Sequence, residues 1–139
     1  MVTLTLSPRR GLAALELAIG GTALAGGALL IAAPDGSLLR ADPSALTGSP
    51  FADWRVPGVL LAGLVGVGFL GAGYCQGTGC RHARKLSIAA GAGLVAFEAA
   101  EFGWLGFQPL EAVFAVAGLS IAVLAGLQNG ESPGGRQRT

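Results

Sequence analysis

Two glutamates three residues apart, Glu98 and Glu101, lie inside a long apolar stretch and have the most distinctive chemistry in the chain. On an α-helix this spacing places both carboxylates on the same face. Two carboxylates this close in a low dielectric do not both ionise easily, so one is expected to hold a proton. The pair is suited to carrying a proton, binding a cation or contacting a ligand. The structural alternative is a buried polar cluster completed by Arg55, Arg40 or Trp104 near the outer surface.

A third glutamate, Glu16, interrupts the first apolar stretch of the chain. The residues that share its helical face are small, which favours an inward orientation. Arg9, Arg10 and Arg84 are its expected partners. With a rise of about 1.5 Å per residue, Glu16 and Glu98 are about 13 Å apart along the membrane normal, so we expect no contact between them.

The fourth glutamate of this kind, Glu111, follows Pro109, and proline is favoured at the first position of a helix. If the last helix begins at this proline, Gln108 is its N-cap and Glu111 takes the third helical position. A carboxylate there satisfies free backbone N–H groups and interacts favourably with the helix dipole. We therefore predict a capping role for both residues.

The segment "CQGTGCRH" supplies a weak candidate metal site made of Cys75, Cys80 and His82. The C-x4-C spacing is unusual for zinc, and a fourth ligand is missing. His82 is the only histidine, which excludes a haem held by two histidines of one chain. No nucleophile elbow, P-loop or HExxH motif occurs. We therefore predict no metal, no cofactor and no enzymatic activity.

The elements that position these residues are expected to be membrane spans. A soluble domain carries about 25% charged residues, whereas this chain has 12% charged and 52% hydrophobic residues. A spanning helix needs roughly 20 apolar residues. The first apolar stretch is about twice as long as that of a signal peptide, which favours a retained span over a cleaved leader. Four spans are predicted, at residues 11–33, 56–74, 86–105 and 110–127.

The predicted fold is therefore all-α, a four-helix transmembrane bundle within residues 1–128. Seven Lys and Arg residues flank one set of span ends and two flank the other, which predicts that both termini are cytoplasmic. Residues 34–55 then form an external loop, and its Asp-Pro and Ser-Pro pairs predict a short, partly helical cap. Residues 129–139 are polar and rich in Gly and Pro, and are expected to form a disordered cytoplasmic tail.

Small residues recur every three or four positions in several spans, a pattern that allows helix backbones to approach closely. Gly118, Ala122 and Gly126 form one such row, and Gly20 and Gly27 lie on one face of the first span. The rows predict tight helix packing, within the chain or against a second copy or another membrane protein. The lipid bilayer is the expected surroundings, and the net charge of +1 does not favour nucleic acid.

Three short motifs carry a resemblance to a known group of proteins. They are "PDGSLL" at residues 34–39, "SPF" followed by an acid and "PG" within residues 49–58, and the Gln108-Pro109 pair that opens the last span. In these motifs the chain resembles small four-span integral membrane proteins of actinobacteria, and it is similar to DoxX-like proteins in topology alone. The resemblance implies four spans and a bacterial plasma membrane, and it implies no mechanism.

These observations favour a small membrane protein that acts through helix contacts with itself or with a membrane partner. The alternative is a proton- or cation-coupled transport component that uses Glu98 and Glu101. A membrane enzyme acting on a lipid or a quinone is a third class, but the sequence supplies no nucleophile or base for it.

Overall fold

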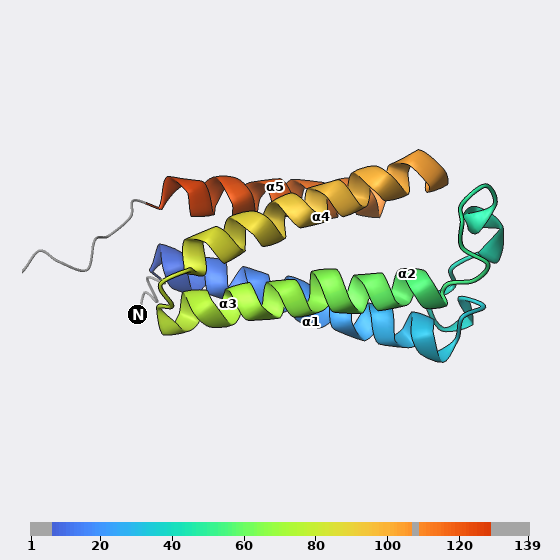
Figure 1. Cartoon of the computed structure of the whole chain (residues 1–139), viewed down its shortest axis with the longest axis horizontal. Helices are drawn as coiled ribbons and strands as arrows, with labels where there is room; N and C mark the ends of the chain where they lie inside the picture. Colours follow the sequence, from blue (N-terminus) through green and yellow to red (C-terminus); the bar gives the residue numbers. More distant parts are fainter. Residues whose placement is uncertain (1–6, 107–108, 129–139) are drawn as a thin grey trace, which may run out of the picture.

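The computed structural model describes residues 7–106 and 109–128, and these form a bundle of long, roughly parallel helical rods (Figure 1). No strand occurs among the described residues. Gln108 and the predicted tail, residues 129–139, lie outside them. The helices, in chain order, are α1 Pro8–Ala32, α2 Arg55–Leu60, α3 Gly68–Thr78, α4 Ala83–Leu105 and α5 Pro109–Leu127, and the π-helical segment η3 Leu61–Val67 joins α2 to α3 without a break.

Three of the rods are long and apolar enough to cross a membrane: Pro8–Ala32, Arg55–Thr78 and Ala83–Trp104. The fourth rod has a shorter apolar part, Ala112–Leu127, so its crossing of the membrane stays a prediction. The start of α1 follows from local chemistry, because the Ser7 side chain accepts a hydrogen bond from the backbone N–H of Arg10. The all-α fold is thus shown, and three of the four predicted spans are long and apolar enough to cross a membrane.

The π-helical segment η3 departs from the regular helix expected for residues 56–74. On one side it packs closely on α1, where Gly66 lies against the backbone of Leu24. On its other side it supplies Leu61 and Val65 to a cavity described below. Single π turns inside α-helices are rare and occur often at functional sites.

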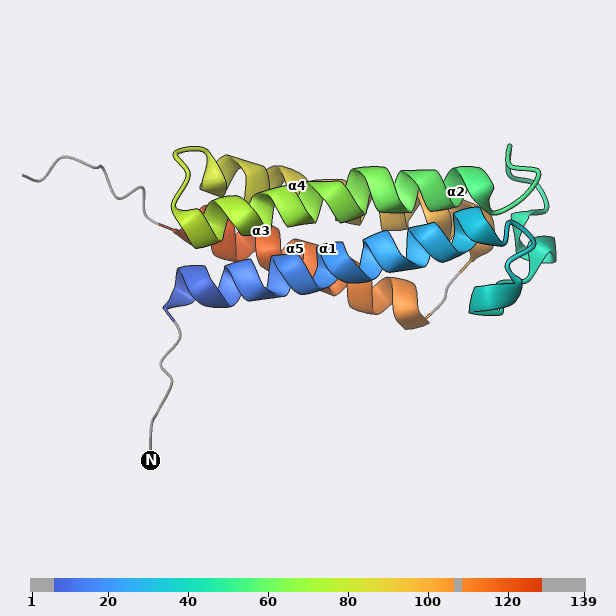
Figure 2. The ribbon, with the colours of Figure 1, turned by 90° about the horizontal axis from the view of Figure 1, so that it is seen from below.

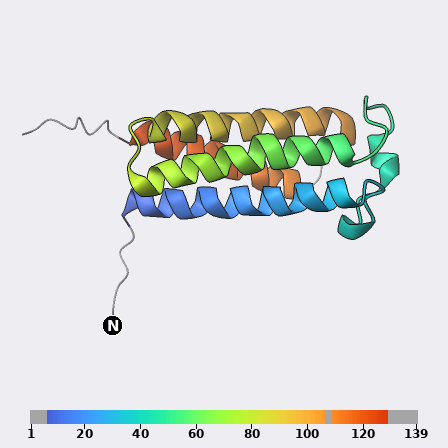
Figure 3. The same cartoon turned by 60° about the horizontal axis from the view of Figure 1, so that its bottom comes forward.

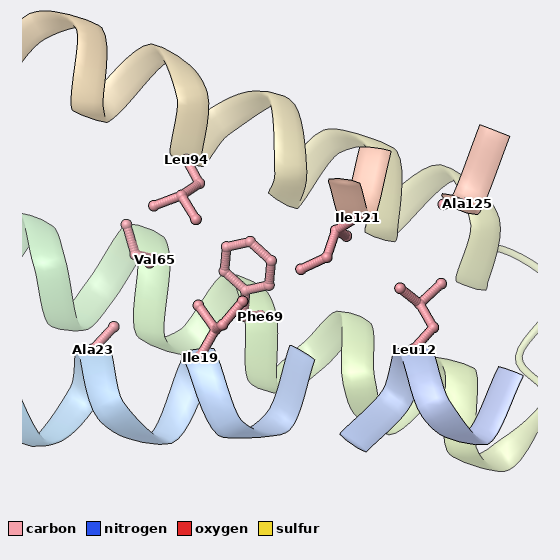
Figure 4. Close-up of a cluster of buried hydrophobic side chains, with 8 residues drawn as sticks. All are labelled: Leu12, Ile19, Ala23, Val65, Phe69, Leu94, Ile121 and Ala125. Carbon is pink, nitrogen blue, oxygen red and sulfur yellow. The ribbon is translucent and has the colours of Figure 1, made fainter. Parts of the chain in front are cut away.

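The rods associate as two pairs. The α1 helix packs along α2, η3 and α3, and α4 packs along α5 (Figures 2 and 3). Contacts between the pairs are concentrated in one apolar core (Figure 4). Its buried members are Leu12, Ile19, Ala23, Val65, Phe69, Leu94, Ile121 and Ala125.

Glycines allow the close contact within each pair. A Cβ added to Gly27 would lie 2.5 Å from the carbonyl oxygen of Gly58, and one added to Gly20 would lie 2.7 Å from the amide nitrogen of Leu70. In the second pair, a Cβ on Gly91 would lie 2.5 Å from the carbonyl oxygen of Gly118 and 2.9 Å from the amide nitrogen of Ala122. Small-residue rows in α1 and α5 therefore face helices of the same chain.

Gly126 differs from the rest of its predicted row. It is exposed, and a Cβ placed there would meet nothing within 4 Å. The row ends early because α4 begins at Ala83 and the last turn of α5 meets the Arg84 side chain instead of a helix backbone. The carbonyl oxygen of Gly126 accepts a hydrogen bond of 2.8 Å from that side chain.

The loop between α1 and α2 contains two short 3-10 helices, η1 Ser37–Leu39 and η2 Pro43–Leu46, as its Asp-Pro and turn motifs predict. Asp42 caps η2 by accepting a hydrogen bond of 2.9 Å from the backbone N–H of Ser44, and this bond lowers the pKa of Asp42. Asp35 has a lowered pKa for the same reason, through Ser37. Backbone-bonded carboxylates thus fix the two turns of this cap.

Trp54 is buried beneath the cap and is not exposed on the surface of the bundle. It is 8% exposed and packs with Leu30 and Leu46 beneath the cap. Its backbone N–H donates to the carbonyl oxygen of Pro34, which ties the two ends of the loop together. Trp54 is therefore the apolar core of the cap.

Gly27→Ala is expected to lower the thermal unfolding midpoint in detergent, because the new Cβ has to displace the backbone at Gly58. Overpacking of this kind costs about 1–3 kcal/mol. Gly21→Ala is the matched control on the same helix, since a Cβ at Gly21 meets nothing within 4 Å. Equal midpoints for the two variants would contradict a tight α1–α2 contact.

Candidate functional site: an acidic cavity below the cap

A cavity of about 530 Å³ lies between the two helix pairs at the end of the bundle nearest the cap. Small-molecule sites in proteins typically have volumes of about 300–1,000 Å³. Most of its wall is apolar and comes from four rods, with Ile19 of α1, Val65 of η3, Leu94 of α4 and Phe114 of α5 among its residues. In Figure 1 the α4 ribbon diverges from the α2–α3 rod toward the cap.

The predicted acidic pair lines this cavity. Glu98 is 7% exposed and Glu101 is partly buried, and both side chains belong to the α4 wall. Their spacing of three residues places them on one face of α4, as expected from the sequence. Arg40 and Asp42 of the cap also line the cavity. The described charged residues of the lining are therefore three acids and one base.

Arg55 takes a different place from the one expected of a partner to these acids. It is exposed at the start of α2, and its backbone N–H is bound to the Asp53 carboxylate at 2.9 Å. Arg40 shares the cavity with Glu98 and Glu101 instead. The cause is the cap, because a 3-10 turn with a left-handed residue at Arg40 folds the loop back over the cavity mouth.

A smaller cavity of about 200 Å³ adjoins the first and is almost entirely apolar. Trp54, Phe97 and Glu101 line both cavities. At its outer side the rings of Phe51 and Trp104 meet edge to face, with centroids 5.8 Å apart. Four aromatic residues therefore line the smaller cavity together with Glu101.

Glu16 is not part of the acidic cavity. It is fully buried in α1, and the Ser87 hydroxyl of α4 is close enough to act on its carboxylate. Arg84, one of its expected partners, donates instead to the carbonyl oxygens of Ala125 and Gly126, at 3.2 and 2.8 Å. The last carbonyl groups of α5 have no partner within their own helix, and they attract this guanidinium.

Gln76 and Ser87 are functional candidates near Glu16 that the sequence did not predict. The Gln76 side-chain amide donates to the Ser87 hydroxyl at 2.9 Å and to the Gln128 side-chain oxygen at 3.2 Å. These residues come from different rods, and their separation along the chain gives no signal of contact. The one available signal is a polar side chain in a span, which marks Gln76 near the end of the second apolar stretch.

The three residues of the weak metal candidate, Cys75, Cys80 and His82, are not brought together as a metal site. Among residues 7–106 and 109–128, no group of three or more His, Cys, Asp and Glu side chains is arranged to hold a metal ion. The Cys75 and Cys80 thiols are hydrogen-bonded neighbours, and hydrogen bonds from Cys75 and Thr78 lower the pKa of Cys80. His82 precedes the first residue of α4. The segment forms a turn in which hydrogen bonds lower the pKa of the Cys80 thiol.

Glu111 lies in the first turn of α5, as predicted for a capping residue. Its side chain, like the whole of Gln108, lies outside the described part of the structure, so the capping roles of both residues stay predictions.

Comparison of the chain with protein-family models, with characterised proteins and with solved structures finds no match. The resemblance to four-span proteins of actinobacteria therefore stays a prediction.

Proposed function

We propose that the protein spans a bacterial plasma membrane four times, with both termini in the cytoplasm, and binds a small amphipathic cation in the acidic cavity. The arrangement of the ends supports the orientation. The start of α1, the α3–α4 turn and the end of α5 lie at one end of the bundle, and the cap lies at the other (Figure 2). Arg9, Arg84 and Lys85 belong to the first end, as the positive-inside rule requires of a cytoplasmic side.

The observation that carries the binding proposal is the pairing of apolar walls with two adjacent carboxylates in a cavity of about 530 Å³. Apolar surface favours the hydrocarbon part of a ligand. The charge of the lining decides the sign of the polar part, because Glu98, Glu101 and Asp42 outnumber Arg40. A ligand with an organic cation at one end and an apolar body satisfies both features.

The interpretation based on helix contacts is weakened by the use of the small-residue rows. Gly118 and Ala122 pack on Gly91, and Gly27 packs on Gly58, all within one chain. These rows are therefore not free to bind a second copy. Gly126 remains open, and contact with another helix through that turn of α5 stays part of the proposal.

The cavity also favours the transport alternative, in which Glu98 and Glu101 take up a proton or a cation from outside. The support is their position at the cap end, with the buried residues Phe69 and Ile121 between this cavity and the opposite end of the bundle. A transporter requires such a barrier between its two sides. Binding and transport share the same site and differ in whether the core opens.

A cysteine in the cap tests the orientation. In the variant Ser44→Cys, a membrane-impermeant maleimide is expected to label residue 44 in intact cells, because Ser44 is exposed in the cap. The native Cys80 of the same molecules is expected to react only after the cells have been permeabilised. Peptide mass spectrometry distinguishes the two labels, and the reverse pattern would show that the cap faces the cytoplasm.

Two ions of equal size and opposite charge test the binding site. Tetraphenylphosphonium, a lipophilic cation, is expected to bind the purified protein in detergent, whereas tetraphenylborate is not. Glu98→Gln and Glu101→Gln should each weaken cation binding about tenfold, because each removes a charge interaction of about 1.4 kcal/mol. Isothermal titration calorimetry measures both affinities.

Asp35→Asn is the matched control, because Asp35 is an acid of the cap that does not belong to the cavity lining. It should leave the affinity for tetraphenylphosphonium unchanged. Equal binding of the two ions, or equal loss in all three variants, would show that the acidic pair does not select a cation.

Reconstituted liposomes test the transport alternative. If Glu98 and Glu101 couple transport, the protein should carry protons or tetraphenylphosphonium across the bilayer, and Glu98→Gln should reduce the flux at least tenfold. A fluorescent pH indicator inside the vesicles reports proton flux, and a cation-selective electrode reports the organic cation. Binding without flux in the parent protein would limit its role to binding.

A further inference from the structure

Three buried polar side chains from three rods lie at the end of the bundle opposite the cap. They are Glu16 of α1, Gln76 of α3 and Ser87 of α4, and they are 0%, 2% and 0% exposed. Polar groups buried in a membrane protein are costly unless each finds a partner. None of the three belongs to the acidic cavity.

The hydrogen-bond donors of this group are fewer than its acceptors. The Gln76 amide uses its N–H groups on Ser87 and Gln128, which leaves the Ser87 O–H as the remaining donor. Both carboxylate oxygens of Glu16 and the side-chain oxygen of Gln76 are buried and lack a well-formed hydrogen bond. A single hydroxyl hydrogen cannot satisfy three acceptor atoms, one pair of which carries a negative charge when ionised.

We propose that Glu16, Ser87 and Gln76 bind one small monovalent cation, a proton or a sodium ion. Oxygen ligands are those that hard cations prefer. One carboxylate with two neutral oxygens balances a single positive charge, whereas divalent sites usually supply more carboxylates. The bound cation compensates for the missing hydrogen-bond donors, because its positive charge interacts with the Glu16 oxygens and with the Gln76 oxygen together.

The neighbouring basic residues do not take this role in the described structure. Arg84 lies one helical turn before Ser87, but its guanidinium is bound to the carbonyl oxygens of Ala125 and Gly126. The Arg9 guanidinium lies near Gly79, in the α3–α4 turn. The side-chain group close to the Glu16 carboxylate is the Ser87 hydroxyl and not an arginine.

A polar connection leads from this site toward the cytoplasmic end. Gln76 links Ser87 to Gln128, which is half-buried just after the end of α5. On the other side, Phe69 and Ile121 belong to the apolar core and are 1% and 0% exposed. The cation is therefore expected to exchange with the cytoplasmic side, independently of a ligand in the acidic cavity.

Two measurements on the purified protein in detergent test this site. The thermal unfolding midpoint is measured as choline chloride is replaced by sodium chloride at constant ionic strength, at pH 5 and pH 8.5. Infrared difference spectra report the carbonyl band of a protonated carboxylic acid. A sodium site predicts a midpoint that rises with sodium at pH 8.5, whereas a proton site predicts a protonated-acid band and no sodium effect.

Glu16→Gln is the decisive variant, because its amide supplies the missing donor without a charge. It is expected to fold, to lose the sodium effect or the acid band, and to unfold at the same midpoint in both salts. Asp35→Asn is the matched control, since it removes a carboxylate of the cap at the other end of the bundle that lines neither cavity, and it should retain the effect.

Ser87→Ala provides an independent test if Glu16→Gln does not fold. It keeps the carboxylate and removes one oxygen, so the sodium concentration at half-effect should rise at least threefold, or the acid band should change frequency. The proposal is wrong if the parent protein shows neither a sodium effect nor an acid band assigned to Glu16. It is also wrong if Ser87→Ala leaves the observed effect unchanged.

Discussion

Close backbone contact at glycine is the constraint on which the rest of the structure depends. Between apolar helices in a bilayer the hydrophobic effect contributes little, so packing contacts have to hold the helices together. Gly27 on Gly58 and Gly91 on Gly118 bring the backbones within each pair into contact. The two pairs meet through larger side chains such as Phe69. Space is therefore left between the pairs, and the acidic cavity lies there.

Buried charge is divided between the two ends of this bundle. A carboxylate at the centre of a membrane costs about 2.5–3.5 kcal/mol on insertion scales, and the chain places Glu98 and Glu101 toward the cap and Glu16 toward the other end. Glu98 and Glu101 share their cavity with Arg40, and the Ser87 hydroxyl is close to Glu16. The apolar core separates the two groups, so a ligand at one end does not contact the other.

Much of the fold follows from local sequence, while the contacts within the sites do not. Apolar length predicts the spans, the Asp-Pro pair predicts the 3-10 turn at Asp42, and spacing predicts that Glu98 and Glu101 share a face. That Arg40 lines the cavity and Arg55 does not depends on how the cap folds over the helix ends. The contact of Gln76 with Ser87 depends on the rotation of two rods about their axes. Neither the fold of the cap nor the rotation of the rods is determined by periodicity within one segment.

The π-helical segment η3 connects the packing constraint with the cavity. A π turn adds a residue to each turn and so rotates the following side chains relative to an α-helix. In η3 the small residue Gly66 faces α1, and Leu61 and Val65 face the cavity. The wider turn lies where the rod contacts α1 through Gly66 and borders the cavity with Val65. The same glycine packing that holds the first pair together thus shapes the wall of the binding site.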